Sequence, residues 1–143
     1  MNPGARTYIA VMGSAIRTCL LLLCLAVPTV ARAVDSFQPI PAAEADLASL
    51  HWTAKPVVVF ADAPEDPAFV EQMRLLSQQW PELAARGVVV IVDTRPADNT
   101  ALRQSLRPRG FALVLLDAEG RVAMRKPFPW SARELGRAID RMR

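Results

Sequence analysis

Cysteine and histidine are almost absent from this chain of 143 residues. There are two cysteines, Cys19 and Cys24, and one histidine, His51. Both cysteines fall in a leader that we expect to be removed, so the mature chain would hold no thiol, which excludes thiol–disulfide and peroxidase catalysis by that chain. A histidine-rich zinc site is excluded as well. We interpret His51, beside Trp52, as a partly buried packing residue.

A long hydrophobic run is also missing. The apolar stretch from Cys19 to Val27 is followed by Pro28 and is much shorter than the roughly 20 residues that span a bilayer. Basic residues precede this stretch, and after it Ala31 and Ala33 supply small residues at the two positions that a signal peptidase reads. This pattern predicts a signal peptide at residues 1–33 and a periplasmic or secreted protein, with a retained membrane anchor as the alternative.

The mature chain is predicted to have no net charge. The sequence has 17 bases and 14 acids, and three bases leave with the leader, so 17 − 3 = 14 bases face 14 acids. We therefore predict no nucleic-acid partner and no membrane contact after cleavage, whereas an unknown protein partner stays open. Residues 34–94 hold three basic and nine acidic residues, whereas residues 95–143 hold eleven basic and five acidic residues. Either the acidic and basic halves form different solvent-exposed faces of the domain and attract one another weakly, or their opposite charges orient an approaching partner.

Three short apolar runs predict buried strands. Residues 57–61 are apolar throughout, which is typical of a central strand covered on both faces. Residues 88–92 follow after one helix, which predicts a parallel crossover. Residues 111–116 run into a hairpin turn at 117–120 and an alternating edge strand at 122–125.

Helix signals separate these strands. Asp66 followed by proline predicts a helix start, and a proline at position 81 predicts a break near Trp80. A short helix is expected at 100–107, and Ser131 with Glu134 forms a capping box for the last helix. The inward stripe of the first of these helices is Phe69, Met73, Leu76, Trp80 and Leu83.

The segment before the first strand carries two weaker predictions. Residues 34–45 contain two prolines and no periodicity, so we expect an extended lead-in that lies against the domain. Residues 46–52 can form one or two helical turns with Leu47, Leu50 and Trp52 turned inward. The domain itself is predicted over residues 46–143.

The order of these elements predicts an α/β fold of thioredoxin-like type, with a central mixed four-stranded sheet and helices on both faces. Five local phrases also resemble a family of secreted bacterial domains of unknown function, similar to the thioredoxin-like domain of the animal equarin and sushi-repeat extracellular proteins. The resemblance covers about residues 46–142 and implies the fold and an extracytoplasmic location, with no established reaction. The phrases are Leu50–Ala61 (LHWTAKPVVVFA), Gln72, Arg86–Val90, Phe111–Gly120 (FALVLLDAEG) and Ala138–Met142 (AIDRM).

An acidic loop occupies the place where a thioredoxin-like domain keeps its redox cysteines. Asp62, Glu65 and Asp66 follow the first strand and precede the helix. These carboxylates could bind a hard cation or act as an acid–base pair, or they could cap the helix and complement its dipole.

A second candidate site is basic. Arg103, Arg107 and Arg109 surround Pro108 and could contact a phosphate or an acidic partner, or form a solvated corner. The sequence shows no phosphate loop, metal-ligand spacing or dinucleotide fingerprint, so we predict no cofactor and no metal. We predict a non-catalytic binding module that uses the loop face near Asp62–Asp66 or the basic end of the hairpin. The alternative is a metal-binding protein or enzyme that uses the Asp62–Asp66 carboxylates.

Overall fold

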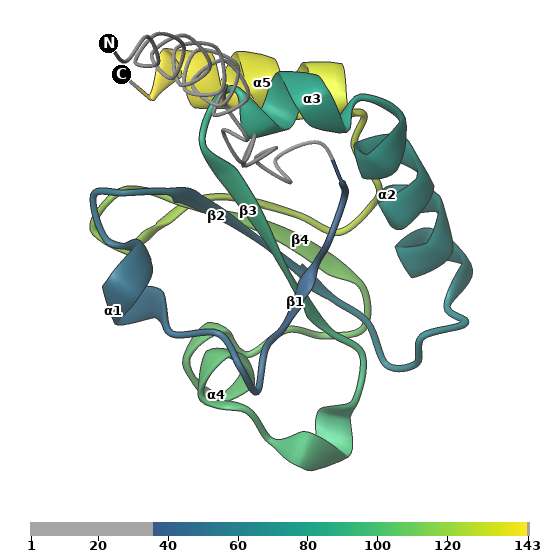
Figure 1. Cartoon of the computed structure of the whole chain (residues 1–143). Coiled ribbons are helices and arrows are strands. Elements are labelled where there is room, and N and C mark those ends of the chain that lie inside the picture. Colours follow the sequence, from purple (N-terminus) through teal and green to yellow (C-terminus); the bar gives the residue numbers. More distant parts are fainter. Residues whose placement is uncertain (1–35, 143) are drawn as a thin grey trace, which may run out of the picture. The chain divides into compact units, whose positions relative to one another are not determined.

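A five-stranded mixed sheet runs through the domain in a computed structural model that describes residues 36–142 (Figure 1). The order of the strands across the sheet is β1-β3-β2-β4-β5. The predicted signal peptide and both cysteines lie outside the described residues. The strands are β1 (Ile40–Pro41), β2 (Lys55–Phe60), β3 (Val88–Asp93), β4 (Ala112–Leu116) and β5 (Val122–Lys126).

The central position predicted for the first long strand is confirmed. β2 pairs in parallel with β3 and antiparallel with β4, so that Val58 lies between Ile91 and Val114. The side chains of β2 from Pro56 onward are buried, because helices cover the sheet on both faces.

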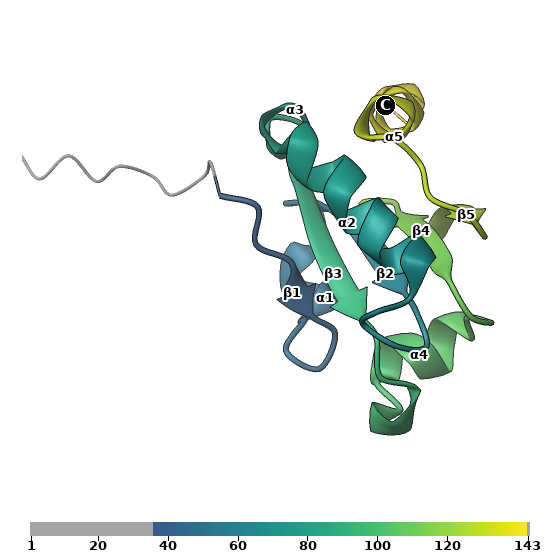
Figure 2. The ribbon, with the colours of Figure 1, turned by 90° about the vertical axis from the view of Figure 1, so that its right-hand side faces the viewer.

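Helices cover both faces of the sheet, as Figures 1 and 2 show. α2, α3 and α5 lie on one face, and α1 and α4 lie on the other. Each face has its own apolar core, centred on Val57, Val59 and Leu135 on the first side and on Val58, Phe60 and Leu102 on the second. The helices are α1 (Leu47–Leu50), α2 (Pro67–Gln78), α3 (Trp80–Ala84), α4 (Ala101–Leu106) and α5 (Ala132–Arg141), with a 3₁₀ turn at Pro96–Asp98.

The helix boundaries follow the predicted signals. The Asp66 carboxylate accepts hydrogen bonds from the first turn of α2, and both halves of the Ser131–Glu134 capping box are present at α5. The predicted break near Trp80 is confirmed, because α2 ends at Gln78 and α3 starts at Trp80 with Pro81 in its first turn. A proline is tolerated there since its missing N–H has no helical partner to lose.

The sheet has one strand more than predicted. Ile40 and Pro41, in the expected lead-in, pair in parallel with Ile91 and Val92, and the Ala42 N–H donates to the Val92 carbonyl over 2.8 Å. Pro41 has no N–H, so this strand is possible only at an edge of the sheet. Two prolines and the absence of periodicity concealed it in the sequence.

Trp52 and His51 differ from their predictions. Leu47 and Leu50 pack against the second core, but Trp52 is 75% exposed. Its backbone has φ 62°, and its N–H donates to the Ala118 carbonyl over 3.1 Å, which turns the indole outward. His51 is exposed too, and its imidazole lies over Gly120.

Candidate functional site

The acidic loop and the loop before β4 meet at one end of the sheet. Asp62 follows the end of β2, whose last residue Phe60 pairs with Ala112 at the start of β4. Gly110 has φ 63°, and a Cβ at that position would be in van der Waals contact with Asp62 Oδ2, at 3.8 Å. Arg109 is the neighbour of this glycine. The two sequence-predicted sites therefore adjoin each other.

The three carboxylates of the acidic loop do not gather into one cluster. Asp66 Oδ1 accepts hydrogen bonds from the N–H groups of Ala68 at 2.8 Å and Phe69 at 3.4 Å, so it caps α2. Asp62 and Glu65 are exposed. Over residues 36–142, no three histidine, cysteine or acidic side chains come together in a metal-binding arrangement.

Arg103 is held inside the domain. Its Nη2 lies 2.8 Å from Asp93 Oδ1, and the two side chains are only 11% and 2% exposed. The same nitrogen donates to the carbonyl of Ala61 over 2.9 Å, and the guanidinium lies over the Phe60 ring. The arginine therefore ties α4 to the ends of β2 and β3, and it is not available to a ligand.

The charge and hydrogen bonds of Arg103 stabilise the ionised form of the Asp93 carboxyl group. Burial raises the pKa of Asp93, but hydrogen bonds from Arg103 and Thr100, together with the positive charge of Arg103, lower that pKa below its ordinary value. The Thr100 hydroxyl donates to Asp93 Oδ2 over 2.6 Å. Asp93 is consequently ionised at neutral pH and belongs to the structural framework of the site.

Arg107 and Arg109 line a surface pocket that does not include Arg103. A pocket of about 390 Å³ opens at the end of the β4–β5 ladder, next to the last turn of α4. We call it the basic pocket. Its lining residues are Arg107, Arg109, Phe111, Ala112, Arg125, Lys126 and Pro127.

The backbone of Arg107 explains why it separates from Arg103. Residues four apart share a face while a helix continues, but α4 ends at Leu106, and Arg107 adopts left-handed geometry with φ 45°. Its side chain leaves the helix and lines the basic pocket. The sequence spacing thus indicated one arginine group, whereas the structure divides it.

The four cations of the basic pocket are held in different ways. Arg125 Nη2 donates to the Leu106 carbonyl over 2.7 Å, and Lys126 Nζ lies 4.5 Å from the centre of the Trp130 ring. Among the described residues, neither Arg107 nor Arg109 makes a side-chain hydrogen bond or ion pair. The guanidinium groups of Arg107 and Arg109 are therefore free to contact an anion, beside a guanidinium group and an ammonium group that have contacts within the domain.

Five residues of the basic pocket were not singled out as site residues by the sequence: Phe111, Ala112, Arg125, Lys126 and Pro127. A signal for them existed. The predicted hairpin at residues 117–120 places the start of β4 opposite the end of β5, and Leu113 indeed pairs with Lys126. Counting outward from the turn brings these residues to the same end of the sheet as Arg109.

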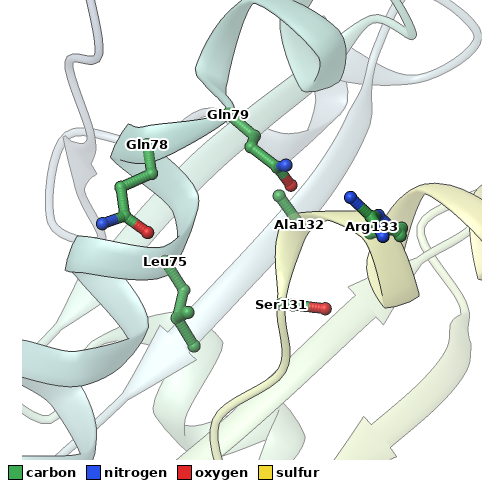
Figure 3. A pocket seen from close by; sticks show the side chains of 6 residues that line it. All are labelled: Leu75, Gln78, Gln79, Ser131, Ala132 and Arg133. Atoms are coloured by element: carbon green, nitrogen blue, oxygen red, sulfur yellow. The ribbon is translucent and has the colours of Figure 1, made fainter.

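A second pocket, of about 440 Å³, lies between α2 and the start of α5. In Figure 3 the Gln79 side chain reaches toward Ala132, whereas Gln78 points away from α5. The Ser131 hydroxyl is bonded to Glu134 in the capping box, and the lining holds no acid–base pair. This pocket offers less to a charged ligand than the basic pocket does.

The family of the chain is established by comparison. Residues 46–143 match the family described as "Domain of unknown function (DUF4174)", and the protein belongs to this family. No curated protein matches the sequence. In the part of the chain that the structure describes, no helix has the length and apolar character needed to cross a membrane.

Solved thioredoxin structures share the fold. Chloroplastic thioredoxin z aligns with TM-score 0.55 and 19% identity over 75% of this chain and 96% of its own. Reduced desulfothioredoxin from Desulfovibrio vulgaris Hildenborough aligns with TM-score 0.53 and 18% identity over 73% of this chain and 99% of its own. A thioredoxin-like protein from Clostridium perfringens aligns with TM-score 0.55 and 16% identity over 82% of this chain and 91% of its own. The predicted thioredoxin-like α/β class is confirmed, and the likeness to the equarin group stays a prediction.

Proposed function

We propose that this protein is a non-catalytic binding module, periplasmic or secreted, whose basic pocket binds an acidic segment of a partner protein. The observation that carries the proposal is the pair of free guanidinium groups, Arg107 and Arg109, beside Arg125 and Lys126. The secreted location rests on the leader pattern of residues 1–33.

The chemistry of the pocket favours carboxylates on a polypeptide. Guanidinium groups bind carboxylates through paired hydrogen bonds, and here they stand next to the apolar surfaces of Phe111 and Pro127. A segment with both acidic and apolar side chains fits such a mixed lining. Each exposed ion pair contributes only about 0.2–1 kcal/mol, so we expect modest affinity that falls as salt increases.

The start of α2 supports a role without catalysis. In a thiol enzyme of this fold, the N–H groups of the first helical turn would stabilise a thiolate. Here the Asp66 carboxylate accepts from the N–H groups of Ala68 and Phe69. The group at this position is therefore a helix cap, and no observation favours the carboxylate-based enzyme over it.

The experiment measures binding of a labelled peptide of about eight residues that alternates glutamate and valine. Fluorescence anisotropy compares the wild type with the R107E/R109E variant at low and moderate salt. The matched control is R133E/R137E, which changes the net charge equally at exposed positions on α5.

We expect R107E/R109E to weaken binding at least about tenfold, and R133E/R137E to change it less than about threefold. A lysine–valine peptide should not bind. Equal loss in both charge-reversed variants, or equal binding of the lysine peptide, would refute the basic pocket as the binding site.

A further inference from the structure

We infer that the acidic segment binds as an added strand along the outer edge of β5, an inference that rests on the proposed function. β5 is the last strand of the sheet and pairs with β4 alone. One edge of its backbone therefore lacks a partner strand among the described residues. Such an edge is a template for an extended polypeptide.

The two edges of the sheet are unequal. At the opposite edge, β1 has two residues, one of them a proline without an N–H donor. β5 has five residues and no proline. Its length provides a ladder of backbone groups that β1 lacks, so an added strand belongs at β5.

Charge selects the occupant of the β5 edge. Residues 121–127 (RVAMRKP) hold three basic side chains and no acidic one. Arg121 is already paired with Asp117 and Glu119 in the adjoining turn. The charge available to a partner at this edge is therefore that of Arg125 and Lys126. Two copies of this edge would place like charges against each other, which opposes self-pairing. An acidic strand would find opposite charges, and its end would reach the basic pocket, because Arg125 and Lys126 belong to both.

Exposed apolar side chains flank the same edge. Val122 at the start of β5 is 45% exposed, and Phe128 just beyond its end is 53% exposed. Side chains alternate between the two faces of a strand. Arg125 and Lys126 are neighbours and therefore lie on opposite faces of β5, and the bulge in the β4–β5 pairing puts Val122 on the face of Arg125. A partner strand that alternates acidic and apolar residues can therefore place its acids on the face of Lys126 and its apolar residues on the face of Val122.

Backbone pairing makes a prediction that side-chain binding alone does not. Only every second N–H of an added strand points toward β5. The glutamate–valine peptide is therefore synthesised with a single N-methyl group at each position in turn. We expect binding to weaken at least about tenfold at alternate positions and to change little between them.

A second measurement observes β5 directly. In hydrogen-exchange NMR of the free protein, we expect the amides of β5 that face away from β4 to exchange fast. Addition of the unmodified peptide should slow these amides, while solvent-exposed amides in α5 exchange as before. Protection of the β5 edge together with the alternating N-methyl effect supports the inference.

The outcomes separate the inference from the proposed function. If the peptide binds and R107E/R109E abolishes binding, but N-methylation has no alternating effect and β5 gains no protection, the basic pocket binds side chains and the added strand is refuted. If no acidic peptide binds the wild type, both are refuted.

Discussion

The buried ion pair between Asp93 and Arg103 gives the strongest stability prediction. Replacing Asp93 by Asn keeps the shape and one acceptor oxygen but removes the charge that balances Arg103. The side chains are 2% and 11% exposed and their atoms lie 2.8 Å apart. Breaking a buried pair from one side costs about 3–5 kcal/mol because the other charge is left without compensation.

We expect D93N to lower the free energy of unfolding by about 3 kcal/mol, at the low end because the amide oxygen still accepts one bond. For a domain of about 100 residues this shifts the melting temperature by on the order of 15 °C. R103M should cost a similar amount, since it removes the arginine that donates to Asp93 Oδ1 and to the Ala61 carbonyl and leaves the buried Asp93 charge with the Thr100 hydroxyl alone as a side-chain donor. The D93N/R103M double variant should cost clearly less than the sum.

Acid should erase the difference between wild type and D93N. The pKa of Asp93 is lower in the folded state than its ordinary value. The stabilisation is therefore complete above the ordinary aspartate pKa and is lost as the pH falls from there through the lowered folded-state pKa. The gap in unfolding free energy between wild type and D93N should narrow over that acidic range.

Urea denaturation followed by far-ultraviolet circular dichroism measures these effects. The control is D98N, which removes an ion pair with Arg95 of similar length, 2.9 Å, whose side chains are 75% and 38% exposed. We expect D98N to cost no more than about 0.5 kcal/mol. If D93N costs no more than D98N, or if the D93N gap persists unchanged in acid, the structural role assigned to the pair is wrong.

Three further substitutions test other parts of the fold. Gln72 is fully buried and bonds both the N–H and the carbonyl of Trp130, so Q72L should cost about 2–4 kcal/mol in urea denaturation; a cost below 1 would contradict this. W52N should be neutral or stabilising by up to about 1 kcal/mol in thermal unfolding, because the exposed indole contributes little and asparagine tolerates left-handed backbone. D66A should lower the free energy of unfolding by about 1 kcal/mol through the lost helix cap, whereas E65A should change it by no more than about 0.5 kcal/mol. Equal costs of the two variants in urea denaturation would argue against capping by Asp66.

Local chemistry explains why so much of the fold was predictable. The apolar runs that became β2, β3 and β4 have no polar side chain to place in water, so only the centre of a covered sheet suits them. Asp66 and Ser131 marked helix starts because they satisfy N–H groups within three residues of themselves. Each of these signals acts over a short stretch of chain.

Features that depend on distant partners were missed. β1 exists because Ile40 and Pro41 find Ile91 and Val92, about fifty residues away, and its own sequence carries no strand pattern. Trp52 is turned outward by a hydrogen bond to Ala118 on the β4–β5 hairpin. An indole with no such constraint would be expected inside, which is what its hydrophobicity suggested.

The charge asymmetry of the sequence decides how the candidate site is divided. The second half of the mature chain has a surplus of 11 − 5 = 6 bases. Asp93, from the acidic half, reaches across to Arg103, and this pairing is satisfied inside the domain. No such partner meets Arg107 or Arg109 among the described residues, although all three arginines lie within seven positions. The difference arises where α4 ends: a helix that continued would place Arg107 beside Arg103, and its left-handed backbone sends it to the basic pocket instead.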